Sequence, residues 1–166
     1  MKTFKCLAAL AALGLTATGA HAAVKKPAPI IERTSNNPAA VISSTATVPP
    51  GFKLVFISGT TPSPADPAKP DDLGDTRAQT ISILTKMKAQ LEGMGMSMGD
   101  IVKMTVFLVA PTPGGRMDSA AMNDVFKTFF GTPEQPNKPT RSTIQIAALG
   151  RPTMYVEIEA VAAKAP

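Results

Sequence analysis

The chain has 166 residues, of which 44% are hydrophobic and 17% charged, as expected for one globular domain. It contains one cysteine, one histidine and no tryptophan, which excludes a disulfide framework and a zinc site built from several imidazole and thiolate ligands. The net charge of +5 comes from lysines and arginines that are spread along the chain, so the composition gives no indication of a nucleic-acid-binding surface.

The first 22 residues have the pattern of a secretory signal peptide. Two lysines open the segment, residues 6–15 form an apolar run, and Ala20 and Ala22 supply the small side chains that a signal peptidase reads. We expect cleavage between Ala22 and Ala23 and a periplasmic or secreted protein with no membrane attachment. The remaining 144 residues would have a net charge of +3 and no cysteine or histidine, which excludes a Ser-His-Asp or Cys-His triad.

The start of the remaining chain predicts a tether, then a strand and a loop. Residues 23–29 are small, basic and carry two prolines, so we expect a flexible tether before a domain at 30–166. The apolar run 54–59 ends in glycine and predicts a buried strand. Four prolines within 60–72 prevent regular strand pairing and predict a loop.

The rest of the chain predicts two helices among three strands. Asp75 as N-cap, apolar residues at helical spacing and Gly93 as the end predict the first helix. A second apolar stripe, capped by Asp118 or Ser119, ends at Gly131. Alternating patterns predict strands at 101–109, 142–148 and 154–162. The resulting order predicts a single α/β domain with a mixed β-sheet and both helices on one face.

Two charged features could belong to a binding site. Arg141 lies where a proline-rich loop meets a strand, and its guanidinium could hold a carboxylate through two parallel hydrogen bonds. Glu157 and Glu159 point to one face of the last strand, about 7 Å apart. An arginine at a loop edge and alternating glutamates are also ordinary solvated side chains, so the residues alone leave both interpretations open.

Two further patterns have a structural explanation that is stronger than the functional one. Residues 95–99 fit the G-x-S-x-G pattern of a hydrolase, but the motif follows a helix and precedes a strand, the reverse of the nucleophile elbow. The methionines at 94, 96 and 98 suggest a Cu(I) site, yet methionine is a common core residue and no other soft ligand is nearby. We therefore expect no bound metal.

Several segments, in the same order along the chain, resemble the RidA/YjgF family of small imine deaminases. They are LVFISG at 54–59, GDIVKMTVFL at 99–108, NDVFKTFF at 123–130, PTRS at 139–142 and VEIEAVA at 156–162. The resemblance covers residues 30–163, and such collinear agreement is more specific than any single motif.

The resemblance implies a fold, an assembly and a reaction. The fold would be chorismate-mutase-like, also called YjgF-like, and three chains would form a homotrimer with a central barrel and three ligand clefts between subunits. The reaction would be hydrolysis of reactive 2-imino or enamine acids to 2-keto acids and ammonia, without a cofactor. The implied partners are thus a small imino or keto acid and two further copies of the chain, and not nucleic acid.

The resemblance also assigns roles to individual residues. In the Pro-x-Arg-Ser motif, Arg141 would bind the substrate carboxylate, and Glu157, the first acid of Glu-Ile-Glu, would orient the attacking water. Asn123, Ser58 and Gly59 match positions that line the family's pocket.

The chain departs from the family pattern at three places. Thr45 stands about where the family has the tyrosine of a Gly-Pro-Tyr segment, and Thr143 stands where a cysteine is common. The loop at 111–115 is a few residues longer than usual. We count both threonines among the expected substrate-binding residues.

Two alternatives to deamination stay open. The chain could be a non-catalytic trimer that binds small keto acids, and release of ammonia from an imine would distinguish an enzyme from such a binder. A ribonuclease role, attached to some relatives, would lack a histidine base.

Overall fold

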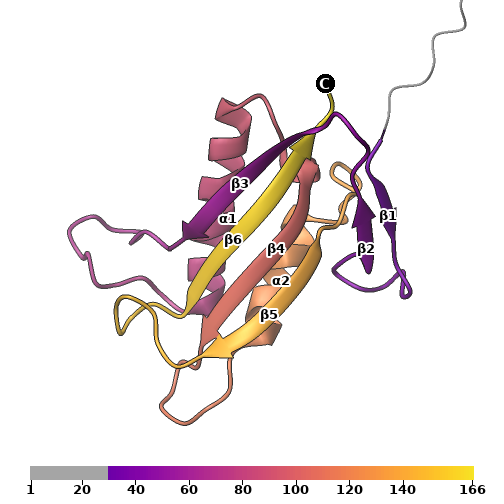
Figure 1. Ribbon diagram of the computed structural model, residues 1–166. Helices are drawn as coiled ribbons and strands as arrows, with labels where there is room; N and C mark the ends of the chain where they lie inside the picture. Colours follow the sequence, from indigo (N-terminus) through magenta and orange to yellow (C-terminus); the bar gives the residue numbers. More distant parts are fainter. Residues whose placement is uncertain (1–29) are drawn as a thin grey trace, which may run out of the picture.

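A four-stranded mixed sheet with two helices against one face forms the body of the protein (Figure 1). The computed structural model describes residues 30–166, and the expected signal peptide (1–22) and tether (23–29) lie outside the described residues. The main elements are β3 (Lys53–Thr60), α1 (Thr76–Gly93), β4 (Ile101–Val109), α2 (Ser119–Phe129), β5 (Thr140–Ile146) and β6 (Val156–Lys164). The strand order is β3-β6-β4-β5, with β6 antiparallel to both neighbours and β4 parallel to β5. The predicted fold class is confirmed.

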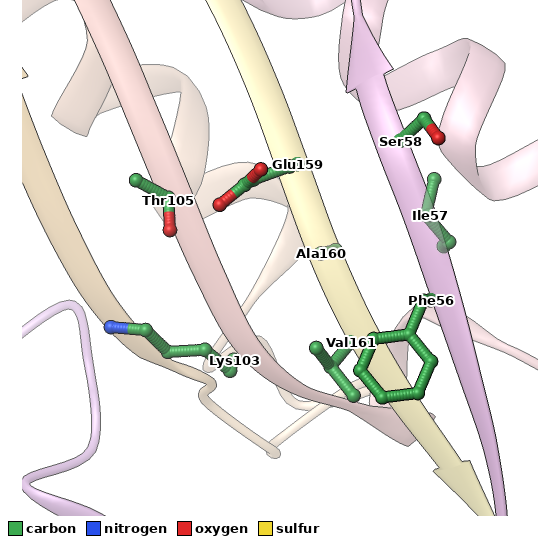
Figure 2. A pocket seen from close by; sticks show the side chains of 8 residues that line it. All are labelled: Phe56, Ile57, Ser58, Lys103, Thr105, Glu159, Ala160 and Val161. Carbon is green, nitrogen blue, oxygen red and sulfur yellow. The ribbon is translucent and has the colours of Figure 1, made fainter.

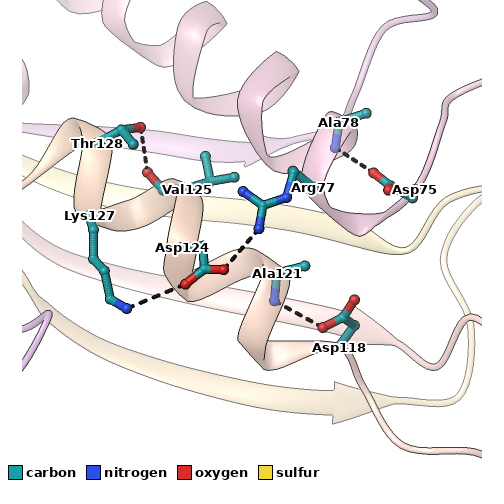
Figure 3. Close-up of polar contacts among 9 residues, drawn as sticks. All are labelled: Asp75, Arg77, Ala78, Asp118, Ala121, Asp124, Val125, Lys127 and Thr128. Atoms are coloured by element: carbon teal, nitrogen blue, oxygen red, sulfur yellow. Dashed lines mark hydrogen bonds and ion pairs between the residues drawn. The ribbon is translucent and has the colours of Figure 1, made fainter.

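Both helices begin where the sequence predicts. The Asp75 carboxylate accepts a hydrogen bond from the backbone N–H of Ala78 at 2.8 Å, and Asp118 accepts one from Ala121 at 2.9 Å (Figure 3). These bonds satisfy N–H groups that have no partner within the helix. Neither helix, nor any other helix within 30–166, is long and apolar enough to cross a membrane.

The core lies between the sheet and the helices. Because side chains alternate along a strand, one face of β4 and β6 points to the helices and the other points away. The helix-facing residues Met104, Val106, Leu108, Val156 and Ile158 have no exposed surface. They pack against the buried faces of both helices, for example at Met87 and Phe126.

The opposite face of the sheet is open, which corrects the prediction of a buried strand at 54–59. β3 is an edge strand, and within it Phe56 is 76% and Leu54 49% exposed while Ile57 is buried. An apolar run does not by itself distinguish a strand buried on both faces from one with an uncovered apolar face.

A small hairpin precedes the sheet and was not predicted. Its strands β1 (Glu32–Thr34) and β2 (Thr45–Thr47) are antiparallel. Ser43 joins it to the loop before β5, since its N–H donates to Pro139 O at 2.9 Å and its hydroxyl donates to Lys138 O at 2.8 Å. Three-residue strands without apolar alternation carry no sequence signal.

The serine and methionine patterns around residue 97 have structural roles. Ser97 is the N-cap of a short 3-10 helix, η1 (Met98–Asp100), and its hydroxyl lies 3.0 Å from an oxygen of the Asp100 carboxylate. Met96 and Met98 are buried in the core, so their thioether groups serve packing.

The central position of β6 predicts a large cost for a cavity there. Ile158→Ala should lower the free energy of unfolding by about 2–5 kcal/mol, because it removes a fully buried side chain. Ile81→Ala, at a 46% exposed position of α1, should change it by less than about 0.5 kcal/mol. Urea denaturation at matched protein concentration measures both, and equal effects would contradict the assigned core.

Candidate functional site

Arg141 is held between β5 and α2. It pairs with Met104 of β4, so its side chain lies on the helix-facing side of the sheet. The guanidinium carbon lies 4.4 Å from the centre of the Phe126 ring, and Nη2 donates to Asn123 Oδ1 at 2.6 Å. Nη1 lies 3.5 Å from the Met122 sulfur. The ring and the amide therefore fix the plane of the guanidinium.

The charge of Arg141 has no carboxylate partner among the described residues. Its Nε is buried without a hydrogen-bond partner, and burial lowers the pKa of Arg141 to about 10. The group is still protonated at neutral pH, so the half-buried side chain presents a positive charge that has lost much of its hydration. An anion that reached it would form a charge-assisted, two-pronged hydrogen bond.

The carboxylate next to Asn123 along the chain is already engaged elsewhere. Asp124 lies 2.9 Å from Nη2 of Arg77, on α1, and 3.4 Å from Nζ of Lys127 (Figure 3). Hydrogen bonds from Arg77 and Lys127 lower the pKa of Asp124. This exposed network ties α1 to α2.

The two threonines of the predicted site lie in different places. Thr143 pairs with Val106 and is on the same face of β5 as Arg141, about 7 Å further along. Thr45 is exposed on the β1–β2 hairpin, and its hydroxyl shares a 2.7 Å hydrogen bond with that of Thr34. Thr143 thus lies on the same side of the sheet as Arg141, whereas the hydroxyl of Thr45 is used within its hairpin.

A second group of predicted residues meets at a β-bulge in β3. Ile57 pairs with Ala160 and Thr60 with Ile158, so β3 has one extra residue there. The Glu157 side chain occupies the space that a side chain at Gly59 would need, because a Cβ on that glycine would lie 2.9 Å from Glu157 Cδ. Glycine is required for this close approach, and bulges commonly direct side chains at functional sites.

These two groups do not meet within one chain. Arg141 faces the helices, whereas Glu157 is on the open face, and β4 lies between their strands. Glu157 pairs with Phe107 and Arg141 with Met104, so they are also three residues apart along β4. Arg141 and Glu157 are therefore separated by about 10 Å across the strands and about 10 Å along them. The chain carries two half-sites: the Arg141 half-site (Arg141, Asn123, Thr143) and the Glu157 half-site (Glu157, Ser58, Gly59).

A hollow of about 270 Å³ on the open face brings further side chains together with Ser58 and Glu159, which the sequence had already singled out (Figure 2). It is lined by Phe56, Ile57, Ser58, Lys103, Thr105, Glu159, Ala160 and Val161. Lys103 Nζ donates to Ser142 Oγ at 2.8 Å. Alternation along β4 and β6 could have placed Lys103, Thr105, Glu159 and Val161 on one face, but only the strand order brings them beside β3.

Comparison with known proteins relates the chain to one family. A family model described as Endoribonuclease L-PSP matches residues 34–164. The 2-iminobutanoate/2-iminopropanoate deaminase of Salmonella typhimurium is 34% identical over 131 residues, which cover 79% of this chain and 94% of that protein.

Solved structures give the same relationship. The crystal structure of Escherichia coli TdcF with bound serine is similar with a TM-score of 0.55 and 36% identity, covering 71% of this chain and 85% of that one. The Rid family protein YyfB from Yersinia pestis has a TM-score of 0.61 at 23% identity, covering 80% and 98%, and supports the fold alone. The chain therefore belongs to the Endoribonuclease L-PSP family, which is the RidA/YjgF family that its sequence resembles.

Proposed function

We propose that this protein hydrolyses reactive 2-imino and enamine acids to 2-keto acids and ammonia. The observation that carries the proposal is Arg141, a charged guanidinium held by Asn123 and Phe126 without a carboxylate partner among the described residues. Such a group fits the carboxylate of a small organic acid. A relative whose name is that of an imine deaminase, aligned over 79% of this chain, supports the reaction class.

The chemistry needs few protein groups. The imine carbon is electrophilic, so water adds to it once the acid is held and the water is oriented. Arg141 and Asn123 would bind the carboxylate, and Glu157 would accept a proton from the attacking water and return it to the nitrogen. In the resulting carbinolamine the hydroxyl proton passes to the amino nitrogen, the carbon–nitrogen bond breaks, ammonia leaves and the carbonyl forms.

We also propose that the complete site lies between copies of the chain in a homotrimer. The two half-sites face opposite sides of one sheet, so one chain does not bring Arg141 to Glu157. The open face of the sheet carries large exposed apolar side chains, with Phe56 at 76%, Leu54 at 49% and Ile144 at 45%. An apolar patch of this kind is typical of a surface that another subunit covers.

Removal of the guanidinium should abolish carboxylate recognition. Arg141→Ala should reduce kcat/KM by roughly 30-fold to several thousand-fold, the equivalent of about 2–5 kcal/mol for a lost partner of a desolvated charge pair. The assay generates an imine in place with an amino-acid oxidase and follows protection from trapping by semicarbazide.

The control is Arg77→Gln, at an exposed arginine that pairs with Asp124, which should leave the rate unchanged. A wild-type rate for Arg141→Ala would reject the site. A wild-type protein that binds 2-keto acids but does not accelerate hydrolysis would support the alternative of a non-catalytic acid-binding trimer.

The bulge predicts a separate effect on the chemical step. Gly59→Ala should displace the Glu157 carboxylate and lower kcat at least tenfold with little change in KM. Glu157→Gln removes the carboxylate itself and should have the larger effect, a loss of kcat of about 10²–10⁴-fold. Gly150→Ala is the matched control, because a Cβ there meets nothing within 4 Å. Steady-state kinetics separate the two constants, and an unchanged kcat for Gly59→Ala would disprove the assigned role.

The open face predicts an oligomer that a charge should disrupt. Phe56→Asp should shift sedimentation from trimer to monomer and lower activity, because it places a carboxylate in the apolar patch. Ile81→Asp, at a 46% exposed position on α1, should remain trimeric. Monomeric wild-type protein at micromolar concentration would contradict the assembly.

A further inference from the structure

Gln79 connects α1 to the segment that immediately precedes Glu157. Its side chain is completely buried, and its carbonyl Oε1 accepts hydrogen bonds from the N–H groups of Tyr155 at 2.7 Å and Val156 at 3.3 Å. Its Nε2 donates to Gly74 O at 2.9 Å and to Thr153 O at 2.8 Å. Two donated and two accepted bonds fill the capacity of a primary amide.

The position of these bonds in the sheet explains why a side chain is needed there. The pairing of β3 with β6 reaches Thr60 opposite Ile158, and the proline-bearing loop that follows β3 supplies no further ladder partner. The residues of β6 just before Ile158 thus lack a neighbouring strand on that edge. The amide of Gln79 takes the place of the missing strand and satisfies N–H groups of Tyr155 and Val156 that lie in a buried or part-buried position.

The same helix also holds the other strand of the Glu157 half-site. Lys86, two turns further along α1, donates from Nζ to Thr61 O at 2.6 Å, and Thr61 follows the end of β3 directly. The hydroxyl of Ser82 accepts a 3.0 Å hydrogen bond from the N–H of Ser63. α1 therefore fixes both the end of β3 beyond Gly59 and the start of β6 before Glu157.

We propose that Gln79 is a positioning residue for the imine-hydrolysing reaction: it fixes the backbone before Glu157 and so the direction of its carboxylate toward the attacking water. This inference rests on the proposed function. Without the amide, the first residues of β6 lose their anchor to α1, and the backbone before Glu157 is held by its contacts with β4, at Val156 and at Tyr155 O. A displacement of about 1 Å is enough to reduce a rate up to 100-fold.

The position of Gln79 away from Arg141 predicts a selective kinetic effect. Gln79→Met keeps the length of the side chain and removes all four hydrogen bonds, so kcat should fall by about 10- to 100-fold. KM for the imine should change less than about threefold, because the carboxylate is bound at the other half-site. Gln79→Glu retains an acceptor for the N–H groups of Tyr155 and Val156, so its kcat should lie between that of Gln79→Met and that of the wild-type protein.

Thr80→Val is the matched control for general damage to α1. Thr80 is also completely buried, but its hydroxyl donates to Thr76 O at 2.7 Å within the same helix and does not reach β6. This variant should lose stability and keep the wild-type kcat. Thermal unfolding, sedimentation and steady-state imine hydrolysis are measured on all the variants, with rates expressed per folded trimer.

The outcomes separate the two proposals. An active wild-type protein with an unchanged kcat in Gln79→Met, or an equal loss of kcat in Thr80→Val, would overturn the role of Gln79 and leave the deaminase proposal intact. Absence of turnover in the wild-type protein would overturn both. If Gln79→Met does not fold, Gln79→Glu is used for the test instead. A folded Gln79→Glu trimer with a raised KM and an unchanged kcat also contradicts the inference.

Discussion

The alternation of side chains along β4 and β6 is the constraint on which the rest of this structure depends. Each strand sends every second residue to the helices and the others to the open face. The helix-facing set, including Met104 and Ile158, is fully buried and forms the core. The other set leaves apolar and polar side chains on a face that the described chain does not cover. Because Arg141 belongs to one face and Glu157 to the other, the same alternation divides the two candidate half-sites between two surfaces.

Each half-site solves a different physical problem. At Arg141 the problem is charge: burial lowers the pKa of the guanidinium to about 10, and contact with a ring and one amide leaves the charge without compensation. A bound carboxylate would compensate this charge and would offset the free energy spent on removing the guanidinium from water. At Glu157 the problem is space, which the chain solves with a bulge and a glycine.

The sequence predicted those features that depend on local patterns. The caps at Asp75 and Asp118, the helical stripes and the alternating strands are set by residues close together in the chain, and the structure has them within a few positions. The residues grouped around Arg141 could be named only through the family resemblance. The separation of Arg141 from Glu157 follows from strand order and register, which no local pattern in this chain encodes.

Other features were missed for equally physical reasons. The β1–β2 hairpin is held by hydrogen bonds from the N–H and the hydroxyl of Ser43 rather than by an apolar pattern. From the sequence alone, Gln79 would be placed on the exposed surface of a helix. Only the tertiary structure shows that its amide takes the place of a neighbouring strand. The exposure of Phe56 depends on whether a layer covers β3, which is a property of the whole sheet.

The close approach of Gly59 and Glu157 also couples two positions that are almost a hundred residues apart in the sequence. The volume beside the bulge is shared, so a side chain gained at position 59 requires either a displaced Glu157 carboxylate or a shorter residue at position 157. Substitutions at these two positions are therefore not independent. Exchange of this pair one residue at a time would pass through a variant in which the shared volume is either crowded or empty.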